Sequence, residues 1–234
     1  MSTQWRLFLL ALRTLTRAPL GAEGASAAAQ ARDANLCAAA RYVPLVGMLV
    51  GALGAVAYWL AAQIWPASVA VIASMLATVL LTGGVHERGL DALGMLFAVL
   101  IKYNALMALS AANLAFPLPE YVALGVIMVA GHAASRALAA SVIATRPQAT
   151  PRVAGGDLAL ALILGFAPAV IMGVPGLAGL AAALLARIAI SAYRKHWLKN
   201  DESAAPGAID PFDATQQLAE ICFYLGALVM RSYT

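Results

Sequence analysis

The stretch YVPLVGMLVGALGAVAYWLAAQIWPASVAVIASMLATVLLTGGV, residues 42–85, contains no charged side chain in 44 consecutive positions. A helix needs about 20 apolar residues to cross the hydrocarbon core of a bilayer, so this stretch is long enough for two crossings. The pair Trp65-Pro66 marks the break between them, because proline disfavours helical backbone in the residue before it. Barrel strands of about 10 residues with alternating polarity do not fit such a run. The stretch therefore predicts two transmembrane helices.

The composition of the whole chain agrees with this interpretation. Hydrophobic residues make up 62% and charged residues 11% of the 234 positions, against about 45–50% and about 25% in soluble domains. The mean hydropathy is +0.82 and the isoelectric point is about 9.3. So few charges cannot cover a globule of this size, which excludes a soluble enzyme and a disordered chain. Nucleic acid is not an expected partner either, since the basic residues lie in short runs between apolar segments.

The remaining apolar segments predict five further helices. They are expected at about 92–119, 121–145, 158–173, 176–192 and 214–231. We therefore expect an all-α integral membrane protein, with residues 1–234 forming a single polytopic domain of about seven transmembrane helices. Six is the alternative, and a re-entrant hairpin competes with two spans at 158–192, because these two helices are near the lower length limit for crossing.

The N-terminal segment differs from the apolar runs. Within residues 3–17, large apolar side chains recur at helical spacing between Arg6, Arg13 and Arg17. This pattern is typical of an amphipathic helix that lies on the membrane surface. Residues 21–40 are mostly small or polar and are expected to form a loose connector.

The polar stretch 82–91 and two buried cations are the first candidates for chemistry. On a helix, Glu87 and Asp91 would share a face and could bind Mg²⁺, which prefers oxygen ligands; a solvated loop with an ion pair is the alternative. Lys102 and Arg136 lie at similar depth in two spans, which suits a pocket for phosphates, although either side chain could instead extend toward the interface. His132, one turn before Arg136, is interpreted as a core histidine.

The last helix carries a polar stripe. Asp210 and Pro211 form a strong helix start, and capping explains Asp210 and Asp213. Gln217 and Glu220 continue the stripe from Asp213 at i+4 and i+7. Capping does not explain them, and an acidic side chain inside a membrane helix requires a partner.

Several of these motifs occur together and in order. They are RYVPLVG at 41–47, TGGVHE at 82–87 with Gly89-Leu90, GHAASR at 131–136, and Gln216-Gln217 with Glu220. In this respect the chain resembles the cobalamin synthases, the adenosylcobinamide-GDP ribazoletransferases, and LTRAP at 15–19 is also similar to the start of that family. The resemblance covers roughly 5–198 and 210–230.

The resemblance implies a bacterial inner-membrane enzyme, multi-pass, acting late in cobalamin biosynthesis beside other enzymes of that pathway. A ribose hydroxyl of α-ribazole, or of its phosphate, would attack the cobinamide-side phosphorus of adenosylcobinamide-GDP, and GMP would leave, with Mg²⁺ required. For the site, the resemblance leads us to expect the catalytic residues Glu87, Asp91 and Arg136. The expected substrate-binding residues are Lys102, His86, Gln217 and Asp210, and the expected metal ligands are Glu87, Asp91 and Glu220.

The acidic motif of this chain departs from the family pattern His-x-Asp-Gly-Leu-Ala-Asp-x-x-Asp-Gly. Arg88 stands in place of its first Asp, Asp91 follows Leu90 directly, and the last Asp-Gly is missing. Fewer carboxylates predict a weaker metal site and impaired turnover. A catalytically inactive membrane scaffold or a transporter is the alternative function.

The basic residues also predict the topology of the chain. Twelve of the 15 Lys and Arg residues fall near one side of the expected spans, whereas the turns at 65–67 and 173–176 carry no charge. By the positive-inside rule, the N-terminus and the loops 86–91, 145–157 and 193–213 are cytoplasmic. Reporter fusions at residues 90, 150 and 205 should therefore read inside and one at 118 outside. A periplasmic signal at residue 90 or 205 would contradict a single catalytic face.

Overall fold

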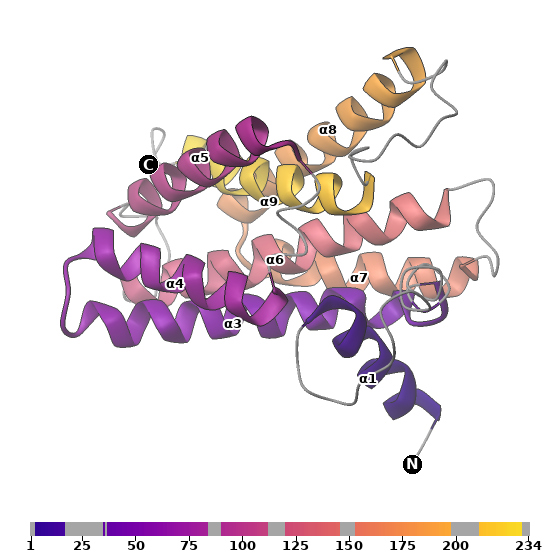
Figure 1. Ribbon diagram of the computed structural model, residues 1–234, viewed down its shortest axis with the longest axis horizontal. Helices are drawn as coiled ribbons and strands as arrows, with labels where there is room; N and C mark the ends of the chain where they lie inside the picture. The colour runs from indigo at the N-terminus through magenta and orange to yellow at the C-terminus, as the bar shows by residue number, and fades with distance from the viewer. Residues whose placement is uncertain are drawn as a thin grey trace.

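In the computed structural model the chain is all-helical over the residues that the structure describes: 3–16, 35, 37–83, 90–111, 120–145, 153–197 and 211–230. The elements in chain order are α1 (Thr3–Leu15), the 3-10 helix η1 (Ala40–Tyr42), α3 (Val43–Ala62), α4 (Ala67–Thr82), α5 (Ala92–Ser110), α6 (Glu120–Ala144), α7 (Gly155–Ile171), α8 (Val174–Trp197) and α9 (Pro211–Val229). Figure 1 shows α3, α4, α6 and α7 running along the long axis of the bundle, with α5, α8 and α9 on one side of them.

The seven helices predicted for the apolar segments are confirmed as helices. Pro66 is the N-cap of α4 with extended backbone, as the Trp65-Pro66 break predicted. Glycines with positive φ close α4 at Gly83 and separate α7 from α8 at Gly173, because glycine adopts this left-handed conformation without steric penalty. α5 ends at Ser110 rather than near 119. The Ser110 hydroxyl donates to the Met107 carbonyl, a local bond that competes with continuation of the helix.

Four of these helices are long and apolar enough to cross a membrane. The candidate spans are Ala40–Ala62, Ala92–Ser110, Val122–Ala144 and Val174–Tyr193, while Ala67–Thr82 and Gly155–Ile171 are shorter apolar helices. Large apolar side chains are exposed along α3, α4 and α5, among them Leu53, Leu80 and Leu96. An exposed apolar surface of this kind is typical of contact with lipid. The chain is thus a helical membrane protein, and the count of seven crossings stays a prediction.

Helix α6 is the centre of the bundle. Its candidate span is 83% buried inside the protein, against 39%, 28% and 17% for the other three. It packs most extensively against α3, and also against α9 and α7. Small residues allow this close approach: Gly51 of α3 faces the α6 backbone, and Gly165 of α7 lies against Ala137 and the Ala133 carbonyl. Close packing of helices through small residues is a general feature of membrane bundles.

The N-terminal helix α1 packs on the start of α3. Ala11 and Leu15 are fully buried, and the Phe8 ring meets Tyr42 edge-on with centroids 6.0 Å apart. Trp5 is 49% exposed, which fits the predicted interfacial helix without testing it. At the end of the connector predicted for 21–40, Cys37 and Ala39 are buried in this cluster, while the connector as a whole stays a prediction. Residues 21–34 lie outside the described ones.

One end of the bundle gathers several helix termini. The ends of α6 and α8 and the beginnings of α7 and α9 lie at the same end, on the right in Figure 1. Polar contacts tie this end together: Arg41 forms an ion pair with Asp157, and Arg187 Nε donates to Ser141 Oγ at 3.1 Å. This arrangement agrees with a single charged face, whose cytoplasmic location stays a prediction.

The contact between α3 and α6 gives a stability prediction. A Cβ at Gly51 would lie 2.7 Å from Val129 Cα and 2.9 Å from the Met128 carbonyl oxygen, both backbone atoms that cannot rotate away. We expect Gly51→Ala to lower the free energy of unfolding by ~1–3 kcal/mol, the usual penalty of overpacking.

Gly156→Ala is the matched control, because a Cβ at Gly156 would meet no atom within 4 Å. It should be neutral or stabilise by ~0.4–1 kcal/mol through reduced freedom of the unfolded chain. Unfolding of both variants in detergent is the measurement, and equal stabilities would contradict the close approach of α3 to α6.

Candidate functional site

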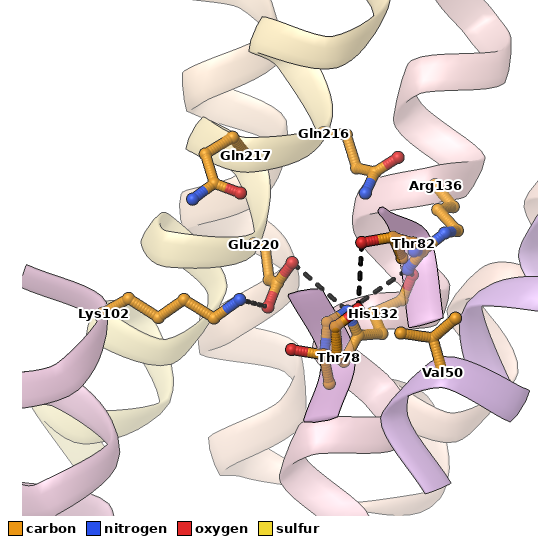
Figure 2. Close-up of a pocket in the computed structure, with 9 residues that line it drawn as sticks. All are labelled: Val50, Thr78, Thr82, Lys102, His132, Arg136, Gln216, Gln217 and Glu220. Carbon is orange, nitrogen blue, oxygen red and sulfur yellow. Dashed lines mark hydrogen bonds and ion pairs between the residues drawn. The ribbon is translucent and has the colours of Figure 1, made fainter. Parts of the chain in front are cut away.

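A polar pocket lies where five helices meet inside the bundle. Figure 2 shows its lining: Val50 from α3, Thr78 and Thr82 from α4, Lys102 from α5, His132 and Arg136 from α6, and Gln216, Gln217 and Glu220 from α9. The free space among these side chains is small, close to that of a single water molecule. The charged lining of the pocket, rather than its size, points to an anionic group as its ligand.

Glu220 is the polar anchor of this pocket. Its Oε1 lies 2.6 Å from Lys102 Nζ, and its Oε2 lies 3.2 Å from His132 Nδ1. The Tyr224 hydroxyl, one turn along α9, donates to Oε1 at 3.1 Å. Glu220 is only 2% exposed, so its charge is balanced by these neighbours rather than by water. The carboxylate thereby joins α9 to α5 and α6.

His132 links Glu220 to Arg136. Its Nδ1 lies 3.2 Å from Glu220 Oε2 and also 3.2 Å from Arg136 NH1. A carboxylate only accepts and a guanidinium only donates, so one nitrogen cannot satisfy both. We assign the proton to Nδ1, donating to Glu220, since hydrogen bonds to charged acceptors are the stronger ones. Arg136 NH1 then donates to the His132 carbonyl, at 3.5 Å.

Arg136 is fully buried. It is the largest of the side chains that have essentially no exposed surface. A Cβ at Gly47 would lie 3.0 Å from Arg136 Cδ, so the missing side chain on α3 makes room for the arginine stem. A cation in this position does not extend to the interface, which removes snorkelling as the explanation for Arg136.

The polar stripe predicted for α9 faces the interior. Asp213, Gln217 and Glu220 are each at most 4% exposed. α9 includes Pro211, while the predicted cap by Asp210 lies outside the described residues. Gln216 joins the pocket beside them. The stripe consequently places two amides and a carboxylate among the cations of α5 and α6.

Four of the predicted site residues come together in this pocket, namely Lys102, Arg136, Gln217 and Glu220. Lys102 and Arg136 therefore line the same space, as the prediction of a common phosphate pocket requires. Figure 2 places the two cations on opposite sides of the Glu220–His132 pair. His86, Glu87 and Asp210 lie outside the described residues, so their roles stay predictions.

Asp91 does not take the position expected for it. It is the N-cap of α5, with extended backbone, and its side chain accepts from the Gly94 amide at 2.7 Å. The helix begins only after it, so the prediction that Glu87 and Asp91 share one helical face is wrong. Its catalytic and metal-binding roles remain untested.

The described residues do not fit a Mg²⁺ site. Glu220 is already bound by Lys102 and His132, and Asp91 caps α5 through one oxygen. Across the described ranges, no group of three or more His, Cys, Asp or Glu side chains is placed to hold a metal ion. Mg²⁺ needs near-octahedral oxygen coordination, so the predicted cofactor depends on ligands outside these ranges.

Sequence reasoning missed two functional candidates, His132 and Tyr224. His132 was interpreted as a core residue and is indeed buried, but it lines the pocket and contacts Glu220. Tyr224 follows Glu220 by one turn, and that i, i+4 spacing on α9 is the signal that could have identified it.

The buried charge cluster gives a further prediction. Glu220→Gln would leave Lys102 buried without its counter-charge, and breaking such a pair costs ~3–5 kcal/mol of stability. Lys102→Met should cost less, because Glu220 keeps His132 and Tyr224 as partners. In the double variant no unpaired cation remains, so it should be more stable than Glu220→Gln alone.

Unfolding of the three variants in detergent measures these differences. The pairing would be contradicted if the losses in free energy of unfolding of the two single variants simply added in the double variant. A larger loss from Lys102→Met than from Glu220→Gln would contradict it as well.

Comparisons with known proteins identify a family of similar enzymes. The family model described as cobalamin-5-phosphate synthase matches residues 7–93. A Leptothrix cholodnii protein named adenosylcobinamide-GDP ribazoletransferase is 34% identical, with 95% of each chain covered. Proteins of the same name from Ralstonia nicotianae (41% identical, 47% of this chain and 52% of the relative) and Shewanella sp. (29%, 97% and 95%) also match.

No solved structure matches the chain. Nothing in these comparisons supports the alternative of an inactive scaffold or a transporter, since the matching proteins carry an enzyme's name. The full-length similarity at 34% identity is sufficient to assign the family. The chain belongs to the cobalamin synthase family of adenosylcobinamide-GDP ribazoletransferases.

Proposed function

We propose that this chain is a membrane-bound transferase that joins adenosylcobinamide-GDP to α-ribazole, or to its phosphate, with release of GMP. The observation that carries the proposal is the pocket in which Lys102 and Arg136 lie with one carboxylate, Glu220. Cationic side chains of this kind are suited to bind the phosphates of a GDP-activated substrate. The relatives' name supplies the substrate class.

The proposed chemistry is displacement at phosphorus. A ribose hydroxyl attacks the cobinamide-side phosphorus, and the bond to the bridging oxygen of GMP breaks. Charge develops on the phosphoryl oxygens, and fixed cations in a water-poor site stabilise that charge more effectively than water does. Lys102 and Arg136 have this role, while the amides of Gln216 and Gln217 are able to donate to further oxygens.

The large corrinoid part of the substrate stays outside the pocket, because the free space among the lining side chains is far too small for it. Sites for the rest of the substrate are therefore expected nearer the charged end of the bundle, where Arg41, Asp157 and Arg187 lie. We further propose that this end faces the cytoplasm from a bacterial inner membrane, with the N-terminus inside, on the strength of the basic loops.

The requirement for Mg²⁺ is proposed only because the chain resembles the cobalamin synthases. The described residues offer no ligand set for it, and Glu87 is the remaining candidate outside them. Contact with lipid is supported by the exposed apolar helices. Association with other cobalamin-pathway enzymes is proposed from the family alone.

Arg136→Leu tests the proposal. Purified protein in detergent, given adenosylcobinamide-GDP, α-ribazole and Mg²⁺, should release GMP only when α-ribazole is present. Arg136→Leu should lower this rate by ~10²–10³, as expected when a charge-stabilising group is removed. Membrane insertion should be intact or improved, since a central arginine costs ~2.5–3.5 kcal/mol on insertion scales.

Arg13→Gln is the control, because Arg13 is exposed on α1 and is not among the residues that line the pocket. It should retain activity close to that of the parent. Absence of ribazole-dependent GMP release by the parent would contradict the proposed function. Equal activity of Arg136→Leu and the parent would show that Arg136 has no part in it.

A further inference from the structure

We propose that His132 is the general base of the transfer: its Nε2 accepts the proton of the attacking ribose hydroxyl, while Glu220 orients the ring. This inference rests on the proposed function and adds to it a catalytic residue on α6. It is carried by three observations: the contact between His132 and Glu220, the unpartnered second ring nitrogen, and the occupied state of the other polar groups of the pocket.

The contact with Glu220 fixes the ring. His132 Nδ1 lies 3.2 Å from Glu220 Oε2, and Lys102 and Tyr224 hold the other oxygen at 2.6 and 3.1 Å. A carboxylate surrounded by donors accepts from Nδ1–H. In the neutral imidazole, Nε2 then carries the lone pair. A carboxylate that sets the tautomer and orientation of a histidine base is a recurrent arrangement in enzymes.

The second ring nitrogen is available for this task. Nε2 is buried and has no hydrogen-bond partner among the described residues. A buried polar atom without a partner is unfavourable unless something else binds it. Because His132 lines the pocket that also holds Lys102 and Arg136, a hydroxyl group on a ligand bound between those cations is the natural partner.

The other described polar groups of the pocket are poor candidates for a general base, because they already form hydrogen bonds or are not basic. Glu220 accepts from three neighbours. The Thr78 and Thr82 hydroxyls donate to the Met75 and Thr78 carbonyls, at 2.8 and 2.9 Å. Lys102 is ion-paired, arginine does not lose its proton in proteins, and the two glutamine amides do not titrate. His132 is therefore the best proton acceptor in this part of the pocket.

The step is balanced. The O–H bond of the ribose hydroxyl breaks, its proton moves to His132 Nε2, and the oxygen forms a bond to the cobinamide-side phosphorus. The bond from that phosphorus to the bridging oxygen breaks, and GMP leaves with the electron pair. The imidazolium formed is stabilised by Glu220, and its proton later returns to solvent.

His132→Asn is the variant that tests this proposal. An asparagine amide is still able to donate toward Glu220, but it offers no basic nitrogen. The single-turnover rate of GMP release should fall by ~10²–10⁴, the usual contribution of a general base. The dissociation constant for adenosylcobinamide-GDP, measured separately, should change by no more than about threefold, because an interaction made only in the transition state was removed.

Ser135→Ala is the matched control. Ser135 is buried one turn away and its hydroxyl donates to the His132 carbonyl at 3.2 Å, so the change disturbs the same segment without touching the ring. It should keep nearly the parent rate. His132→Gln serves as a second variant with the same expected loss, and the unfolding temperature of every variant is recorded in detergent.

The outcomes separate the two proposals. No GMP release by the parent refutes the proposed function itself. A parent that is active, with His132→Asn equally fast, overturns the role of His132 as a base. If affinity for adenosylcobinamide-GDP falls in parallel with the rate of GMP release, His132 has a binding role. If both His132 variants unfold, it has a structural role. Either result also overturns the proposal that His132 is the base.

Discussion

The buried carboxylate of Glu220 is the constraint on which the site depends. It sits on α9 within reach of Lys102 on α5 and His132 on α6, so α9 must meet two helices that lie far from it in the sequence. Burying a carboxylate without partners is very unfavourable. The ion pair with Lys102 and the hydrogen bonds from His132 and Tyr224 reduce this penalty. They also place Lys102 and the imidazole beside the small space that Arg136 lines. The same interactions that satisfy the fold thus assemble the candidate catalytic groups.

This arrangement is possible because α6 is made largely of small residues on its packed faces. Ala133, Ala134, Ala137 and Ala140 are essentially unexposed, and glycines on α3 and α7 bring those helices into backbone contact with α6. Close neighbours keep water and lipid away from Arg136, which in turn strengthens its interaction with a bound anion. The wide apolar faces of α3, α4 and α5 are left for the bilayer, so the polar chemistry is confined to the centre and to one end.

Much of the fold followed from the sequence, because charge-free runs and Pro66, Pro211 and Gly173 mark the helices directly. A shared pocket for Lys102 and Arg136 was predicted, and so was the need of Glu220 for a partner, since charges within apolar helices must find partners inside the bundle. That Lys102 is this partner was not predicted, because the two residues lie on helices far apart in the sequence. The role of His132 was not predictable, because its partner Glu220 lies on a distant helix and a single histidine on an apolar helix resembles a core residue. The position of Asp91 was misjudged for a local reason: its backbone is extended and it is the N-cap of α5, so it is not itself part of a helix.

We expect the pocket between α5, α6 and α9 to bind the diphosphate of the activated substrate. A structure of the protein in lipid nanodiscs with adenosylcobinamide-GDP bound is the decisive experiment. It should show diphosphate oxygens within hydrogen-bond distance of Lys102 Nζ and the Arg136 guanidinium, with Glu220 still contacting His132. A diphosphate bound elsewhere, with the Lys102–Glu220 pair intact and no phosphate contact to Arg136, would contradict it.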